Sequence, residues 1–414
     1  MQHGIWVATR CPLTDEHQTP SVTILDHAAP MAFALSPKRL YLSRGLLAEL
    51  SSEAELAFVL ATQSSHLCAG HRLGHDGDAV LPRPEAIMRV LLTPGSFFER
   101  DWAQVLKGFD GASQLAAARN AMAITLRAGY SIAVLESLLD HLAAMRAAQV
   151  HPTLTGLIPL TTGPGDLDSS ARATWLAQAR RDAYARANPP SAGQLKRDAY
   201  MQQLDGLHFG SPVHEGVVRG RHFFHRELGI SFELPAGWTL RNHSDRVVGW
   251  GPQRTQFFQL NAFRAKPGER FDDLLRRQTR LEPMPSAWFD LDGRAHQSMT
   301  ARADTPLGRR AIDIVVTTLP THIADITFAL LMTQRQTPTN SPPALIQIAR
   351  SLTRLSKKAQ PFASPIRIHL TRPKAGTTFA TLAKPGLVNP DTLRRINRTS
   401  APHPIAGSLV KVLH

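Results

Sequence analysis

The chain has 414 residues and a formal net charge of +14; 43% of its residues are hydrophobic and 19% are charged. This length predicts about two or three domains. The apolar fraction is enough for packed cores, which excludes a chain that has no hydrophobic core. No apolar run reaches the ~18–20 residues of a membrane-spanning helix, so no such helix is expected.

The basic balance raises the question of nucleic-acid binding. Basic pairs such as Arg180-Arg181 and Arg276-Arg277 are scattered and are not interleaved with stacking aromatic residues. A solvated basic surface, or electrostatic attraction to anionic lipid or envelope polymers, explains the charge without nucleic acid. We therefore expect no nucleic-acid partner, and the charge is compatible with peripheral membrane association.

The first strongly patterned element starts at Ser52. Ser52 is followed three residues later by Glu55, which is the capping-box spacing that opens a helix. Thr62 and His66 lie four residues apart, the spacing that can place two ligands on one metal ion. Six residues then share one helical face, which we expect to point inward: Leu56, Val59, Leu60, Gln63, His66 and Leu67.

An ordered set of segments surrounds and includes this helix: Ala32-Phe33-Ala34, Arg44-Gly45-Leu46-Leu47, Ser52-Glu53-Ala54-Glu55-Leu56, His66, Ala128-Gly129-Tyr130 and His151-Pro152. These segments resemble the HtpX-like and CAAX-prenyl-protease-type zinc metallopeptidases, including their BepA-like members. In that family the helix bears His-Glu-x-x-His and holds zinc, and the resemblance implies a mostly helical, gluzincin-like domain over residues 1–205.

The positions that carry zinc chemistry in that family are replaced here. The first His is Thr62, the Glu is Gln63, and only the last His remains, as His66. Counting back from the Ala128-Gly129-Tyr130 turn places the family's third ligand on Ala116. Threonine is a poor zinc ligand, and glutamine cannot act as a general base near neutral pH. We expect no intact catalytic residue and no cofactor, with His66 as a vestigial metal ligand, although active relatives use zinc.

Two further departures agree with this interpretation. Pro37-Lys38 stands where the family has a Gly-Gly pair, and a proline removes a backbone donor from the strand edge at which a peptide would pair. In the segment from His151 to Ile158, Leu157 replaces an arginine.

Other potential ligands follow the helix. His66 and His71 are five residues apart, about 140° around a helix, which suits chelation poorly; Cys68 and His75 are the remaining candidates. We expect His66 to be a buried residue that hydrogen-bonds to Gln63 or to the backbone. Cys68 is expected to be a small core residue, because no basic neighbour lowers the pKa of its thiol. With Cys11 it makes only two cysteines, too few for a disulfide framework, and they fit either redox compartment.

A composition shift marks a second domain over residues 215–356. Strand alternation around Ile230–Leu234, Ile312–Val316 and Ile323–Leu330 precedes an amphipathic helix that Ser341-Pro342 opens. With the opening segment Glu215-Gly216-Val217-Val218-Arg219-Gly220, this order resembles the PsbP/Mog1-like α/β domain; an anonymous antiparallel sheet with one helix predicts the same pattern. The core is expected around Phe232, Trp238, Ile314 and Phe328.

The last segment, residues 366–414, reads strand, helix, helix, strand. Arg372 to Phe379 and Gly407 to Val412 resemble parts of a LysM-like module, although Thr377 replaces the usual aspartate. LysM modules bind N-acetyl-glycan chains, so the resemblance implies peptidoglycan as a partner and an envelope location.

These observations predict an α+β multidomain protein: a degenerate metallopeptidase domain, an antiparallel α/β domain and a small βααβ tail. The expected function is that of a homologue of envelope quality-control metalloendopeptidases that has lost catalysis and binds envelope proteins or peptides as a scaffold. The expected location is periplasmic or envelope-associated. Relatives usually carry an export signal and an extra helix upstream, so this chain is either shortened or begins late. The alternatives are an active metalloendopeptidase with an unrecognised site and a basic nucleic-acid-associated protein.

Overall fold

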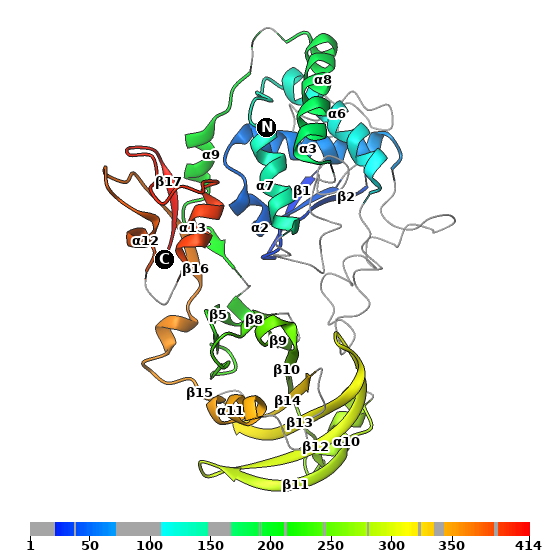
Figure 1. The fold of residues 1–414 in the computed structure, drawn as a ribbon, viewed down its shortest axis with the longest axis vertical. Helices are drawn as coiled ribbons and strands as arrows, with labels where there is room; N and C mark the ends of the chain where they lie inside the picture. The colour runs from blue at the N-terminus through cyan, green and yellow to red at the C-terminus, as the bar shows by residue number, and fades with distance from the viewer. Residues whose placement is uncertain are drawn as a thin grey trace. The chain divides into compact units, whose positions relative to one another are not determined.

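The computed structural model describes residues 21–36, 39–71, 109–147, 167–189, 191, 193–210, 213–242, 246–279, 281–321, 324–334, 343–384 and 388–414. These residues form two compact units (Figure 1). The first unit contains the described residues up to Gly210 together with Ile366–His414, and the second contains those in between. The second unit is therefore inserted into the chain of the first. Helices and antiparallel sheets occur in both, which confirms the expected α+β class.

The first unit is built on a small three-stranded sheet with helices packed around it. The strand order is β1-β3-β2, with β1 parallel and β2 antiparallel to the central strand. Helix α3 packs against α6, and α6 packs against α8. The bounds are β1 (Ser21–Leu25), β2 (Ala32–Ser36), β3 (Arg39–Ser43), α2 (Arg44–Glu49), α3 (Glu53–Cys68), α6 (Gly111–Arg127), α7 (Leu135–Ala147), α8 (Ser169–Ala187) and α9 (Arg197–Gln203).

Helix α3 begins and ends where its sequence predicts. The Ser52 hydroxyl accepts the Glu55 backbone N–H at 3.2 Å, and the Glu55 carboxylate accepts the Ser51 backbone N–H at 2.7 Å. The second half of the capping box therefore goes to Ser51 and not to Ser52. The helix ends before Gly70, whose φ of +67° is the left-handed conformation that glycine adopts without strain.

The Arg44-Gly45 pair has a structural explanation. A Cβ on Gly45 would lie 1.9 Å from the Ala28 carbonyl oxygen, so only glycine fits at this close approach. The buried Arg44 guanidinium donates to Asp26 Oδ1 at 2.7 Å and to the carbonyls of His208 and Gly210 at 2.7 and 2.9 Å. The pair thus joins the start of α2 to two distant parts of the same unit.

Residues 366–414, named here the C-terminal module, fold as strand, helix, helix, strand, in the order that the sequence predicts. The second described sheet of the first unit has the order β17-β16-β4. The apolar side chains of the module lie in the same core as those of α3 and α6; among them are Ile368, Phe379, Leu393, Ile396 and Leu413. The bounds are β4 (His208–Phe209), β16 (Ile366–Thr371), α12 (Phe379–Leu382), α13 (Pro390–Ile396) and β17 (Val410–Leu413).

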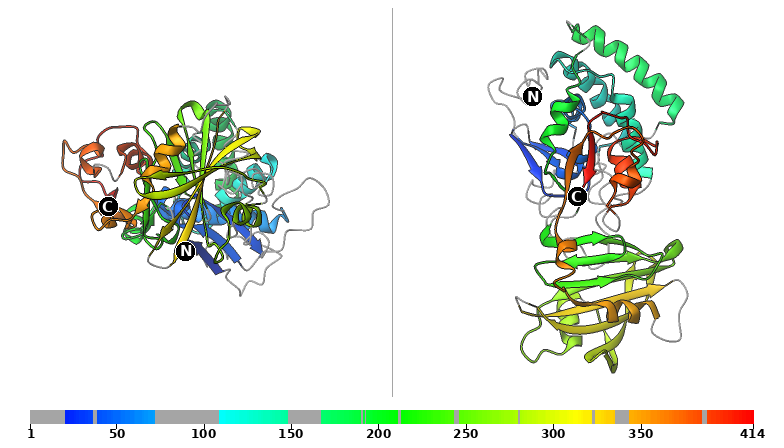
Figure 2. Two further views of the ribbon diagram at one scale, coloured as in Figure 1. Left: turned by 90° about the horizontal axis from the view of Figure 1, so that it is seen from below. Right: turned by 90° about the vertical axis from the view of Figure 1, so that its left-hand side faces the viewer.

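The second unit contains a seven-stranded antiparallel sheet of described strands in the order β11-β12-β13-β14-β10-β9-β8, and a smaller sheet in the order β15-β7-β6-β5. The long strands β12 to β14 twist strongly (Figure 2). The strands are β5 (Val217–Arg219), β6 (His222–His225), β7 (Ile230–Glu233), β8 (Thr239–Asn242), β9 (Arg246–Trp250), β10 (Gln256–Phe263), β11 (Met284–Leu291), β12 (Arg294–Thr305), β13 (Gly308–Pro320), β14 (Asp325–Gln334) and β15 (Thr353–Arg354). The helices are α10 (Phe271–Thr279), α11 (Pro343–Ser351) and the 3-10 turns η3 (Val213–Glu215), η4 (Pro252–Arg254) and η5 (Gln360–Ala363).

Each face of the large sheet has its own core. Phe232, Trp238 and Phe328 pack together with the apolar face of α11, as expected. Ile314 was expected in the same core but lies in the other one, with Leu275 of α10. The physical reason is the two-residue period of a strand, which sends neighbouring side chains of β13 to opposite faces.

The opening segment of the second unit is also explained by its contacts. Gly216 has a φ of +93°, and a Cβ there would lie 2.5 Å from the Phe223 ring. The buried Arg219 guanidinium donates to the Ser364 carbonyl at 2.7 Å and to the Phe362 carbonyl at 3.3 Å. Arg219 therefore fastens the first strand of this unit to its last residues. In the parts of the chain that the structure describes, no helix is long and apolar enough to cross a membrane.

Candidate functional site

Helix α3 carries the candidate site and buries it. Thr62 and Gln63 are 0% and 1% exposed, and His66 is 1% exposed. The Thr62 hydroxyl donates to the Phe58 carbonyl at 2.9 Å, one turn earlier in the same helix. A hydroxyl that is held in this way is not presented to a metal ion.

His66 is held on both ring nitrogens and on one face. Its Nδ1 lies 3.0 Å from His71 Nδ1, and its Nε2 lies 3.3 Å from Gln114 Oε1. The Phe109 ring stacks on the imidazole with a centroid separation of 3.5 Å and an angle of 7°. The expected partners, Gln63 and the backbone, are not the ones observed. A neutral imidazole can satisfy this arrangement if Nε2–H donates to Gln114 and Nδ1 accepts from His71.

The electrostatics favour the neutral ring. The pKa of His66 is lowered to about 3, chiefly by burial and to a smaller extent by His71, while the Gln114 hydrogen bond acts in the opposite direction. The ring is therefore uncharged across the physiological range, with no lone pair left over once both hydrogen bonds are made.

Gln63 stands where an active relative has its general base. Its side-chain Oε1 is buried and accepts no hydrogen bond from the described residues, and the same holds for the Ser65 hydroxyl oxygen. Buried polar atoms without a partner are uncommon, because each gives up its hydrogen bonds to water without replacement. Helix α3 thus buries two polar oxygens, of Gln63 and Ser65, that have no hydrogen-bond partner among the described residues.

Ala116 is not brought to His66. It is exposed, whereas Gln114 on the same helix is buried and contacts the imidazole. Residues 114, 117, 118 and 121 follow the three- and four-residue steps of the face that packs on α3, and two residues from Gln114 the chain has turned about 200°. On α6 the residue that lies beside His66 is therefore Gln114, which the sequence pattern did not single out.

The Ala128-Gly129-Tyr130 turn ends α6 and holds the start of α3. The Tyr130 hydroxyl donates to Glu53 Oε2 at 3.2 Å, and burial together with Glu53 raises the pKa of Tyr130 to about 12. The Gln194 N–H donates to the Gly129 carbonyl at 3.0 Å. This part of the expected scaffold is present and has a positioning role.

The remaining candidates contribute no ligand set. Cys68 is disulfide-bonded in a chain with only one other cysteine, so it is neither the free core thiol that we expected nor available to a metal. Pro37-Lys38, His75 and the segment from His151 to Leu157 lie outside the described residues. Within the described ranges, no group of three or more His, Cys, Asp or Glu side chains could hold a metal ion.

The residues that the structure describes around α3 therefore do not fit a hydrolytic zinc ion. The position of the first ligand offers a hydroxyl that is bonded to its own helix, and the position of the base offers an amide. The His66 imidazole has both nitrogens occupied, one of them by His71, and a ring stacked on it. Tight zinc binding needs several deprotonated ligands acting together.

Comparison with known families places a similarity on this same stretch. Peptidase family M48 matches residues 7–90. The match includes the sheet β1 to β3 and the helices α2 and α3, so the chain is similar to M48 metallopeptidases where the altered motif lies. No curated protein matches the chain.

Among the solved structures that match is a crystal structure from Bacteroides thetaiotaomicron VPI-5482. It is 13% identical, with a TM-score of 0.24, and the match covers 34% of this chain and 50% of that one. The chain thus spans about half the length of that protein. A match at this level carries no argument about fold or activity.

Proposed function

We propose that this chain is an M48-like scaffold that binds proteins or peptides and does not hydrolyse them by a zinc mechanism. The observation that carries the proposal is the state of His66, which is buried, neutral, bonded at both nitrogens and covered by Phe109. Thr62 and Gln63 on the same helix support it, because neither replaces a missing ligand or base.

The binding role is placed in the bacterial envelope. Cys68 supports this location, because disulfide bonds persist mainly in oxidising compartments such as the periplasm. The resemblances to BepA-like peptidases, to PsbP/Mog1-like domains and to LysM modules point the same way, with unfolded envelope proteins and peptidoglycan as partners. Peripheral association with anionic lipid remains compatible with the charge of +14.

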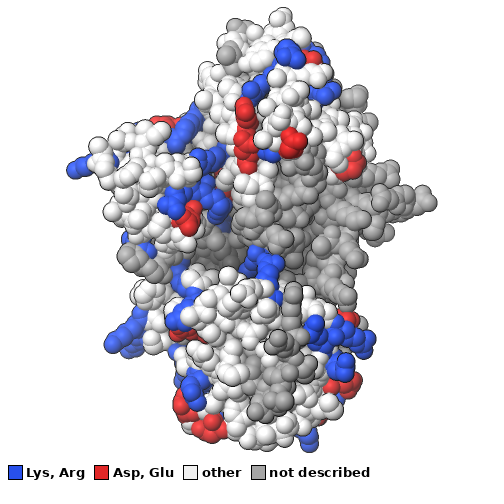
Figure 3. Space-filling model, in the orientation of Figure 1, with Lys and Arg blue, Asp and Glu red and all other residues white. Residues whose placement is uncertain are grey.

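A nucleic-acid role has less support. On the face drawn in Figure 3, Lys and Arg form several separate groups that are interspersed with acidic residues, where a nucleic-acid surface would present a continuous stripe. Many of the arginines are also engaged in ion pairs within their own unit, among them Arg172, Arg276, Arg277, Arg395 and Arg398.

Zinc content and proteolysis test the proposal together. After dialysis, the purified chain is expected to hold well under one zinc per chain by mass spectrometry, and to show no casein hydrolysis that a chelator inhibits. It should still bind a permanently unfolded model protein, such as reduced and carboxymethylated lactalbumin, without cleaving it. One tightly held zinc per chain together with chelator-sensitive hydrolysis would establish the alternative, an active metalloendopeptidase with a different site.

The compartment is tested by the cysteines. In protein isolated from its native host without reductant, Cys68 should not react with maleimide until the disulfide is reduced. Labelling before reduction would contradict an oxidising location.

A further inference from the structure

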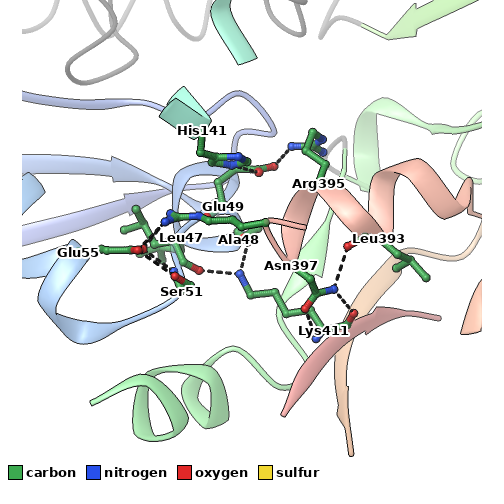
Figure 4. Close-up of polar contacts among 12 residues, drawn as sticks. Leu47, Ala48, Glu49, Ser51, Glu55, His141, Leu393, Arg395, Asn397 and Lys411 are labelled. Carbon is green, nitrogen blue, oxygen red and sulfur yellow. Dashed lines mark hydrogen bonds and ion pairs between the residues drawn. The ribbon is translucent and has the colours of Figure 1, made fainter. Parts of the chain in front are cut away.

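The C-terminal module carries a large share of the basic charge of the chain. Its only acidic side chain is Asp391. Its basic side chains are Arg367, Arg372, Lys374, Lys384, Arg394, Arg395, Arg398 and Lys411. Three of them, Arg395, Arg398 and Lys411, contact one place in the first unit: the α2–α3 elbow, defined here as residues 47–55. Figure 4 shows Arg395 and Lys411 directed at Glu49 and Ala48 of this elbow.

The first contact joins Arg398 to the carboxylate that closes the first turn of α3. Arg398 Nη2 donates to Glu55 Oε2 at 2.8 Å and to the Glu49 carbonyl at 3.0 Å. Glu55 is 0% exposed and also accepts from the Ser51 N–H and hydroxyl, at 2.7 and 2.9 Å. A carboxylate with this degree of burial needs a paired cation, and the module supplies it.

The second contact places a buried ammonium at the end of α2. Lys411 is 0% exposed, and its Nζ donates to the carbonyls of Ala48 and Leu50 at 2.6 Å each. Helix α2 has no basic residue in its own last turn, so the cation at its negative end comes from β17. Asn397 holds β17 in place, accepting the Lys411 N–H at 2.8 Å and donating to the Lys411 carbonyl at 2.8 Å (Figure 4).

The third contact is at Glu49, which is 4% exposed. Its carboxylate is paired with Arg395 of the module and with His141 Nε2 of α7 at 2.9 Å. Burial favours the neutral acid, but Arg395 and His141 outweigh it and lower the pKa of Glu49 to about 2. The elbow is thus the meeting point of α2, α3, α7, α13 and β17.

We propose that the C-terminal module is an intramolecular clamp that sets the position of α3 through the α2–α3 elbow. Its cations neutralise two buried carboxylates and cap the free carbonyls of α2, and no other cation among the described residues is paired with Glu55. Without the module, the elbow would hold buried, uncompensated negative charge, and the start of α3 would open. The clamp is independent of the proposed loss of zinc chemistry.

Hydrogen exchange on the full chain tests the clamp. In Arg398→Ala, the amides of the first half of α3 should exchange at least about 100-fold faster, because an unpaired buried charge is strongly destabilising. Arg394→Ala is the matched control, since Arg394 lies four residues before Arg398 in the C-terminal module and pairs only with the exposed Asp391 among the described residues. It should leave α3 exchange unchanged, and the strands β13 and β14 of the second unit should keep their protection in both variants.

Equal α3 exchange in Arg398→Ala and Arg394→Ala would overturn the proposal. If Arg398→Ala does not fold, Arg398→Lys decides, because it keeps the charge but cannot donate to both Glu55 oxygens and the Glu49 carbonyl. It should give α3 exchange between that of the unmodified chain and that of an open helix. Exchange identical to Arg394→Ala would again overturn the clamp. Zinc content should not change in any of these variants.

Discussion

The two ends of α3 differ in how many of their buried polar atoms have a hydrogen-bond partner. At the start, Glu55 is buried and every oxygen of its carboxylate has a partner. Further along, the Gln63 Oε1 and Ser65 Oγ atoms are equally buried and have no partner among the described residues. The start of the helix is therefore held by specific interactions of its carboxylate, whereas in the motif His66 has hydrogen-bond partners and the Gln63 and Ser65 oxygens have none among the described residues.

The largest effect should come from the elbow. Glu55→Gln leaves Arg398 buried without its counter-charge and should lower the free energy of unfolding of the first unit by ~3–5 kcal/mol. Urea denaturation followed by a probe in each unit measures it. Glu136→Gln is the control, because Glu136 is exposed and its Arg180 contact is long at 3.9 Å; it should have no measurable effect. Equal free energies of unfolding in the two variants would contradict a special role for the buried polar contacts at the start of α3.

Restoring zinc ligands tests the other end of α3, which carries the altered motif. Thr62→His and Gln63→Glu combined with Gln114→Glu should bind zinc at least ~100-fold more tightly than the same pair combined with Ala116→Glu. Gln114 lies beside His66, whereas Ala116 is exposed on the other face of α6. Competition with a chromogenic zinc chelator measures both affinities. Tighter binding by the Ala116→Glu combination would show that α6 is phased differently from the structure.

The buried Lys411 amine predicts that stability depends on pH at the elbow. Burial lowers the pKa of Lys411 from its ordinary 10.5 to about 7. Between these values the unfolded chain binds a proton that the folded chain does not, so stability rises with pH across this window and this contribution is flat below it. The groups that face Lys411 are Glu49, Glu55, Arg398 and Arg197.

The expected slope is about 1 kcal/mol per pH unit between about pH 7.5 and 9.5. Chemical denaturation at several pH values measures it, and Lys411→Met should remove this slope even though the variant is less stable overall. A slope that survives in Lys411→Met would assign it to another group.

The smallest change in stability is expected from substituting two buried glutamines, Gln63 and Gln114. Gln63→Leu removes an unpartnered oxygen and should leave stability unchanged or raise it by about 1 kcal/mol. Gln114→Leu removes a partner of His66 and should lower stability by about 1–2 kcal/mol. Thermal unfolding of the two variants side by side is the measurement. Destabilisation by Gln63→Leu that matches Gln114→Leu would mean that Gln63 has a partner after all.

Local patterns predicted much of this molecule. The capping box and the apolar stripe placed a helix from Ser52 to Gly70, and α3 runs over Glu53–Cys68. The four elements of the C-terminal module were also predicted in order. These features depend on neighbours within a few residues, where helix and strand periodicity are informative.

Long-range features were not accessible in this way. The Arg398–Glu55 pair joins residues 343 positions apart, and nothing in the sequence around either residue announces the other. The contact of Gln114 with His66 was not foreseen either, because a sequence pattern does not show the rotation of α6 relative to α3. The disulfide at Cys68 was missed for the same reason, since two cysteines alone do not show whether they meet.

The insertion of the second unit has a consequence for the order in which the protein can fold during synthesis. The described strands of the second unit are all synthesised before β16 and β17, so this unit can complete its own sheets before the first unit is complete. Helices α2 and α3 are synthesised earlier still, but Arg395 and Arg398, which pair with Glu49 and Glu55, come only with α13 and the residues just after it. The first unit therefore cannot complete its fold, and leaves apolar surface exposed, until β17 has been synthesised. Correct folding of the first unit should therefore depend far more on chaperones that bind nascent chains than correct folding of the second unit does.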